Sequence, residues 1–149
     1  MVTRPSAGWL LLVYSVPREP SANRVAIWRK LKRLGAILLH DAVWVLPSSD
    51  RTREQFQWLA SDIGDLGGEA FVWHGSLAVD GQEEALVRQF VSQVEGQYAE
   101  ILAELEGPDP DLTSLSRRYQ QARAQDHFHS PLAERARAAL LAAGGRTEP

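Results

Sequence analysis

The stretch "WLLLVYSVPREPSANRVAIWRKLKRLGAILLHDAVWVLP", residues 9–47, decides the fold. It opens with a nearly continuous apolar run that stops at Pro17, and such a run is typical of a buried strand. A basic amphipathic segment follows and ends at Gly35, which predicts a helix. Two short apolar runs on either side of His40-Asp41 then predict a tight hairpin.

The next segment predicts a second helix and a fourth strand. Residues 48–68 end in two glycines and carry an apolar stripe at helical spacing, and residues 69–75, "EAFVWHG", form a short β-rich run. Ser48, Ser49 or Asp50 can cap this helix, and the stripe is Phe56, Leu59 and Ile63. The order β-α-β-β-α-β is the split βαβ arrangement of ferredoxin-like domains. The predicted fold class is therefore α+β, with a ferredoxin-like βαββαβ sandwich over residues 1–80.

A different pattern begins at Gly81. Apolar residues recur three and four positions apart, which predicts a long helix to about Glu106 with the seam Val87, Val91, Val94, Tyr98, Ile101 and Leu105. A break at 107–110 precedes a further helix, and Ser130-Pro131 reads as the cap and first position of a last one. We expect an appended C-terminal helical region, residues 81–143, packed on the first domain or on a partner, and a flexible tail, residues 144–149.

The bulk composition is that of an ordinary globular protein, with 44% hydrophobic and 23% charged residues in a chain of 149. The absence of cysteine excludes a disulfide framework, a thiolate metal site and a cysteine nucleophile. No run approaches the roughly 18 apolar residues of a membrane span, and no signal-cleavage pattern follows the first apolar segment. We expect a cytoplasmic protein without a membrane contact and without a cofactor.

Charge is distributed unevenly along the chain. Residues 1–80 carry nine Lys and Arg against eight Asp and Glu, whereas residues 81–149 carry seven against eleven. The segment from position 24 to 33 contains five cations and no acid: Arg24, Arg29, Lys30, Lys32 and Arg33. A segment in which every charged residue is a cation favours an anionic partner, either nucleic-acid phosphate or a small oxyanion, over a merely solvated helix face. Arg117, Arg118 and Arg123 form a weaker second cluster.

Helical spacing also predicts how the basic helix lies. Ser21 or Asn23 can cap it, and the expected buried face is Val25, Trp28, Leu31 and Leu34, opposite Arg29, Lys30 and Arg33. Trp28 and Trp58 fall on the predicted core stripes of their helices, and strand alternation leaves open the face taken by Trp9, Trp44 and Trp73. We expect the tryptophans to pack in the core rather than to stack on nucleobases.

Several motifs together resemble the N-terminal domain of the chromate-resistance regulatory protein ChrB. They are a first strand ending in Pro, "RVAIWRKLKRLGA", "AVWVLP", "FQWLA" and "GGEAFV", and "SRRYQQARAQDHF" resembles the arginine-rich helix that follows in that family. The resemblance covers roughly residues 9–143 and implies a non-enzymatic regulatory or binding protein that contacts DNA. Full-length ChrB proteins carry a larger chromate-resistance domain for which this chain has no room, so a separately encoded one is an expected partner.

The same βαββαβ plan is similar to the CRISPR-associated adaptation nuclease and to the middle domain of the PaaX repressor. The nuclease places an aspartate at the end of the first strand to hold a metal ion, whereas Ser15 stands here. Asp41 lies in the predicted hairpin turn, where aspartate commonly bonds its own backbone. We therefore do not expect cutting, and a metal-dependent nuclease stays an alternative beside a pure protein-interaction module.

Two further predictions concern metal and self-association. Asp126, His127 and His129 are weak metal candidates, with His40 or His74 as remote partners, but turn and helix-end chemistry is the favoured explanation for them. No catalytic signature is present. Edge strands of a four-stranded sheet can template pairing, and part of the long seam is expected to stay open, so we expect a homodimer.

Overall fold

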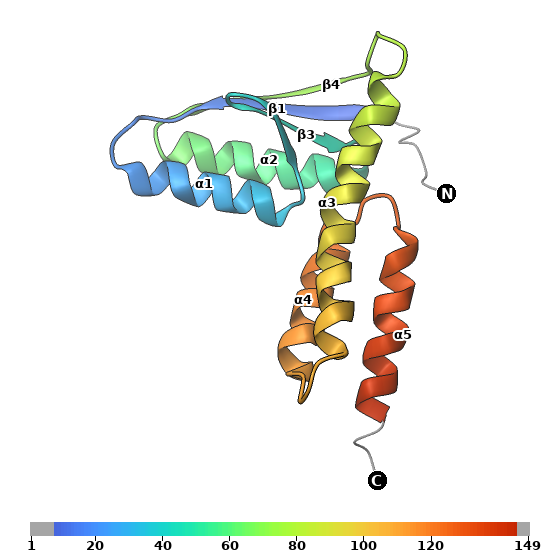
Figure 1. Cartoon of the computed structure of the whole chain (residues 1–149). Coiled ribbons are helices and arrows are strands. Elements are labelled where there is room, and N and C mark those ends of the chain that lie inside the picture. The colour runs from blue at the N-terminus through green and yellow to red at the C-terminus, as the bar shows by residue number, and fades with distance from the viewer. Residues whose placement is uncertain (1–7, 146–149) are drawn as a thin grey trace. The chain divides into compact units, whose positions relative to one another are not determined.

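The computed structural model describes residues 8–145, which form two compact units that divide after Glu83 (Figure 1). The first, called the sheet unit, contains β1 (Trp9–Ser15), α1 (Ser21–Arg33), β2 (Ile37–His40), β3 (Val43–Pro47), α2 (Asp50–Asp65) and β4 (Glu69–Gly75). The second, called the helical unit, contains most of α3 (Gln82–Leu105), with α4 (Leu112–Gln125) and α5 (Pro131–Gly145). The last helix thus continues two residues past the predicted start of the tail, and residues 146–149 lie outside the described residues.

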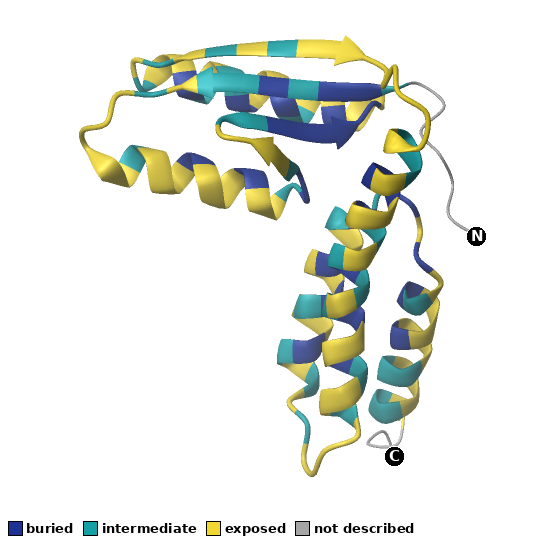
Figure 2. Ribbon diagram, turned by 45° about the horizontal axis from the view of Figure 1, so that its top comes forward, coloured by how far each residue is buried: buried dark blue, intermediate teal, exposed yellow. Residues whose placement is uncertain are grey.

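The sheet unit has the predicted ferredoxin-like architecture. Its four strands are antiparallel in the order β2-β3-β1-β4, and α1 and α2 lie side by side on one face of the sheet (Figure 1). The two central strands, β1 and β3, are the most buried, and β2 and β4 form the edges (Figure 2). This confirms the α+β fold class with a helical region appended at the C-terminal side.

The strand register determines which side chains face the helices. Leu10 pairs with Leu46 and Leu12 pairs with Trp44, and directly opposed residues share a face of the sheet. All four are buried, and the core of the sheet unit also takes Ile27 and Leu31 from α1 and Phe56, Leu59 and Ile63 from α2. The predicted stripe of α2 is confirmed.

A capping box explains why α2 begins at Asp50. The Ser49 hydroxyl accepts a hydrogen bond from the Thr52 amide at 3.1 Å, and the Thr52 hydroxyl accepts one from the Ser49 amide at 2.9 Å. Ser49 is thus the cap among the three predicted candidates. The predicted caps of α1 are wrong, because Pro20 is its N-cap and Ser21 already belongs to the first turn. Gly35, with φ +76°, follows the end of that helix as predicted.

The predicted buried face of α1 is also wrong in part. Val25 and Trp28 are 45% and 49% exposed, and the residues that point into the core are Ile27 and Leu31. The α1 sequence offers two overlapping apolar stripes, and the sheet buries the aliphatic one. Trp58, predicted on the core stripe of α2, is 67% exposed.

The helical unit has its own hydrophobic core. Buried residues from three helices form it: Val94, Tyr98, Ile101, Leu115, Tyr119, Ala122, Ala133 and Ala136. Four seam positions of α3 are buried as predicted, whereas Val91 and Leu105 are half-buried, and Leu86 and Phe90 are buried without having been predicted.

Ser130 accepts a hydrogen bond from the Leu132 amide at 3.2 Å and precedes Pro131 at the start of α5. In residues 8–145 no helix has the length and hydropathy to cross a bilayer.

Candidate nucleic-acid interface

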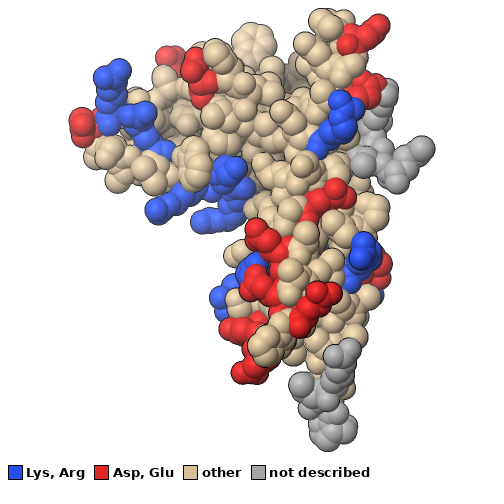
Figure 3. Space-filling view, in the orientation of Figure 1, with Lys and Arg blue, Asp and Glu red and all other residues tan. Residues whose placement is uncertain are grey.

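The five predicted cations of α1 all lie on its solvent-exposed surface: Arg24, Arg29, Lys30, Lys32 and Arg33. Because Ile27 and Leu31 anchor the helix to the sheet, the remaining directions around its axis point to water. Figure 3 shows Lys and Arg side chains gathered along α1, whereas the visible face of the helical unit carries mainly Asp and Glu. Residues 24–33 of the helix therefore form a basic strip about three turns long.

The cations of this strip differ in their contacts. Lys30 forms a salt bridge with Asp62 of α2, with Nζ 2.9 Å from Oδ2, and Lys32 Nζ lies 5.9 Å from the centre of the Trp28 ring. Within the described part of the chain, Arg29 and Arg33 make no salt bridge. Two guanidinium groups thus present their donors to solvent, as a phosphate-binding surface requires.

The predicted second cluster is largely engaged within the helical unit. Arg118 lies 2.7 Å from Glu104 and 3.7 Å from Glu100, and its hydrogen bond with Glu104 raises the pKa of Arg118 and lowers that of the glutamate. Arg123 donates a hydrogen bond to the Tyr119 hydroxyl at 3.0 Å, which raises the pKa of that arginine. Of the three arginines of this cluster, only Arg117 is exposed and makes no such contact within residues 8–145, so the cluster is a poor phosphate surface.

The weak metal candidates have other contacts. Asp126 is buried and accepts hydrogen bonds from the Tyr98 hydroxyl and from the Ser130 amide. The ring of His127 packs edge-on against Phe90, with centroids 5.9 Å apart, and His129 is exposed with φ +56°. Among residues 8–145 no three His, Asp or Glu side chains are grouped so that they could hold a metal ion.

The end of β1 carries Ser15, as the sequence indicated, and Ser15 is exposed. Asp41 lies in the β2–β3 turn with φ +46° and pairs with His40 at 3.2 Å. Burial raises the pKa of Tyr14, which lines the same hollow as Arg24 of α1. These side chains shape the surface beside α1, and no carboxylate occupies the position of the nuclease aspartate.

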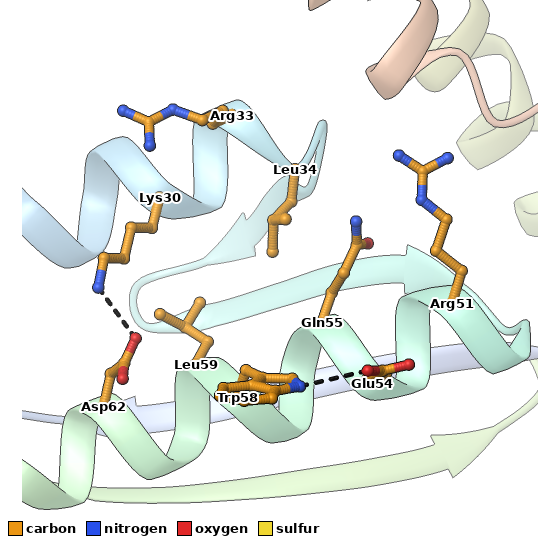
Figure 4. Close-up of a pocket in the computed structure, with 9 residues that line it drawn as sticks. All are labelled: Lys30, Arg33, Leu34, Arg51, Glu54, Gln55, Trp58, Leu59 and Asp62. Atoms are coloured by element: carbon orange, nitrogen blue, oxygen red, sulfur yellow. Dashed lines mark hydrogen bonds and ion pairs between the residues drawn. The ribbon is translucent and has the colours of Figure 1, made fainter.

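A groove between α1 and α2 was not predicted. Its volume is about 370 Å³, and it is lined by Lys30, Arg33, Leu34, Arg51, Glu54, Gln55, Trp58, Leu59 and Asp62 (Figure 4). Figure 4 shows Leu34, the residue after α1, pointing toward α2, and Gln55 and Trp58 on α2. The sequence carried a signal for this second face of α2, because Arg51, Gln55, Trp58 and Asp62 recur at spacings of four, three and four.

Comparisons with known proteins agree with this architecture. The family model described as "Protein ChrB, N-terminal" matches residues 24–104, which include the whole basic strip. Protein ChrB of Cupriavidus metallidurans is 39% identical over 102 residues, which are 68% of this chain and 31% of that protein. The chain thus spans about a third of the length of this relative, and no solved structure matches it. On the match to more than half of its length, the chain belongs to the ChrB N-terminal family.

Proposed function

We propose that this protein is a non-enzymatic regulatory protein of chromate resistance that contacts the phosphates of DNA through α1. The observation that carries the proposal is that an exposed helix has five cations and no acid between positions 24 and 33. Phosphate contacts of this kind supply most of the sequence-independent affinity for nucleic acid. Family membership supports the link to chromate resistance.

The proposal includes a homodimer in the cytoplasm. A second copy doubles the number of phosphate contacts, and the β2 and β4 edges of the sheet leave backbone groups that can pair. A separately encoded chromate-resistance domain is the expected partner for signal input. Ser15 at the end of β1 supports binding without cleavage, because a neutral hydroxyl is a poor ligand for a divalent cation.

The test is a protein variant in which three cations of the basic strip are replaced by neutral residues. The variant Arg24→Gln/Arg29→Gln/Lys32→Gln removes three cations, none of which lines the α1–α2 groove, and it leaves the Lys30–Asp62 salt bridge intact. We expect affinity for a DNA duplex to fall roughly tenfold or more at about 0.1 M salt, and the slope of log K against log salt to flatten by about two to three. Fluorescence anisotropy over a salt series measures both quantities.

A matched control separates local contact from net charge. Arg53→Gln/Arg88→Gln/Arg135→Gln removes the same charge from exposed positions on three other helices. This control is expected to bind nearly as the wild type does. If the strip variant keeps the wild-type affinity and salt slope, or if both variants lose affinity equally, α1 is not the phosphate surface.

A further inference from the structure

The α1–α2 groove has the dimensions of a small-ligand site. Its volume of about 370 Å³ falls within the roughly 300–1,000 Å³ of such sites. Leu34, just after α1, and Leu59 and Trp58 of α2 contribute apolar surface, and polar side chains line the rest of the groove (Figure 4). Both helices belong to the sheet unit, so the groove is formed within one unit.

Trp58 gives the groove an open aromatic surface. Its exposed fraction, 67%, is the largest of the five tryptophans. The indole Nε1 donates a long, exposed hydrogen bond to Glu54 Oε1 at 3.4 Å, one helical turn earlier (Figure 4). Trp28, in contrast, already has the Lys32 ammonium near its ring. An exposed indole in a groove is suited to stacking on a planar ring.

Gln55 adds an unfilled hydrogen-bonding position. Its Oε1 is buried and has no hydrogen-bond partner. A buried acceptor left unpaired costs about 1–3 kcal/mol, and such groups in native proteins call for an explanation. Gln55 and Trp58 line the same groove, and rotation of the Gln55 amide about its last torsion would turn Oε1 from its buried position toward a planar ligand that stacks on Trp58 and carries an N–H on its edge. Every nucleobase has such a donor and a flat face.

The charges of the groove admit an anion. Of its two acids, Asp62 is paired with Lys30 at 2.9 Å, whereas Glu54 accepts a hydrogen bond from the Trp58 indole, which is neutral and does not offset its charge. Arg33 and Arg51 are the further cations that line it, one from each helix. The three cations and two acids of the lining sum to +1, so a phosphate attached to the stacked base would be attracted toward Arg33 and Arg51.

From these observations we propose that the α1–α2 groove holds an unpaired nucleotide of a bound DNA strand, with its base on Trp58, a base N–H on Gln55 Oε1 and its phosphates against Arg33 and Arg51. The inference rests on the proposed contact of α1 with nucleic acid. It adds that the protein prefers DNA with an unpaired base over a fully paired duplex, since a stacked base is inaccessible inside the duplex.

The experiment compares three ligands: a single strand of about 12 nucleotides, the corresponding duplex, and free dAMP. For Trp58→Ala we expect roughly tenfold weaker binding of the single strand and duplex affinity within about twofold of the wild type, and Trp58→Phe is expected to retain most of the binding. Trp73→Ala, at an equally exposed tryptophan on β4 outside the groove, is the matched control and should change neither.

Gln55→Leu gives a readout that packing alone would not produce. Removal of an unpaired buried oxygen is not expected to lower the free energy of unfolding, yet single-strand affinity should fall several-fold. The groove assignment is wrong if Trp58→Ala and Gln55→Leu leave single-strand binding unchanged, or if Trp73→Ala weakens it equally. Tight binding of dAMP that requires Trp58 would overturn it as well, by assigning the groove to a free nucleotide.

The two proposals fail separately. If the Arg24/Arg29/Lys32 variant binds single strand and duplex as the wild type does, the phosphate surface on α1 is refuted. If that variant loses affinity for both while the groove variants lose affinity for neither, the phosphate surface stands and only the nucleotide site is refuted.

Discussion

The hydroxyl of Tyr98 in α3 donates a hydrogen bond to Oδ2 of Asp126 at 3.0 Å, across 28 residues of chain. Asp126 caps the end of α4 and also accepts from the Ser130 amide just before α5, so the carboxylate links all three helices of the helical unit. Tyr98 is fully buried in the core of that unit. The aspartate that resembled a metal ligand in the sequence is therefore a structural acceptor.

Tyr98→Phe should destabilise the helical unit by about 1.5–3 kcal/mol, because a hydrogen bond to a charged, buried acceptor is lost while the ring packing remains. Urea denaturation followed by helical circular dichroism measures the change. Tyr119→Phe is the matched control: its hydroxyl contacts the exposed Arg123, so the expected cost is smaller, at most about 1 kcal/mol. Equal losses in the two variants would contradict the special role of the Asp126 contact.

Alkaline pH should remove part of the contribution of Tyr98. Burial, with the neighbouring Asp126 carboxylate, raises the pKa of Tyr98 far above its usual value. The folded state then keeps the phenol proton at a pH where the unfolded chain, with a pKa of about 10, releases it. The contribution of the raised Tyr98 pKa to the free energy of unfolding is fully present below about pH 10. It falls above that pH, by about 1 kcal/mol at roughly pH 10.7. The difference in unfolding free energy between wild type and Tyr98→Phe should shrink by that amount. A difference that does not change with pH would refute this contribution of the Tyr98 proton.

Gly68, just before β4, should not tolerate a side chain. A Cβ there would meet the Ser15 carbonyl oxygen and lie 2.8 Å from Val16 Cγ1 and 2.9 Å from Ile63 Cγ2. Gly68→Ala is expected to cost about 1–3 kcal/mol or more, because backbone and packed side chains must both shift. Gly64→Ala, four residues earlier in α2 with open space around its Cβ position, should instead stabilise the helix by up to about 1 kcal/mol. Thermal melts of both variants, compared with the wild type, measure these changes. A Gly68→Ala protein as stable as the wild type would contradict this packing.

Self-association is expected to give a homodimer. The sheet order leaves β2 and β4 as edges, and β4 is the longer of the two, with seven residues against four. Unpaired backbone groups on such an edge can bind a second copy through the same surface. Sedimentation equilibrium at micromolar concentration should give twice the mass of one chain. A single-chain mass that does not change with concentration rules the dimer out.

The local features of this chain followed from its sequence, because each depends on near neighbours. Alternation and turn chemistry gave β4 its observed bounds, 69–75, and helical spacing identified the buried Phe56, Leu59 and Ile63 of α2. Glycine and proline placed the break between α3 and α4 and the start of α5 at Pro131. The basic strip of α1 was likewise visible, since the run of five cations without an acid is a property of the sequence alone.

Only the tertiary structure decided what each face of these elements contacts. Leu31 of α1 is buried as predicted, but helical spacing allowed either Val25 and Trp28 or Ile27 to be buried beside it, and packing against the sheet selected Ile27. The contacts of Arg118 with Glu104, and of Tyr98 with Asp126, join residues from different helices. The groove that brings Trp58 and Gln55 beside Arg33 likewise exists only where α1 lies next to α2. Side chains distant in sequence meet through packing, and spacing along one helix carries no information about the neighbour it will contact.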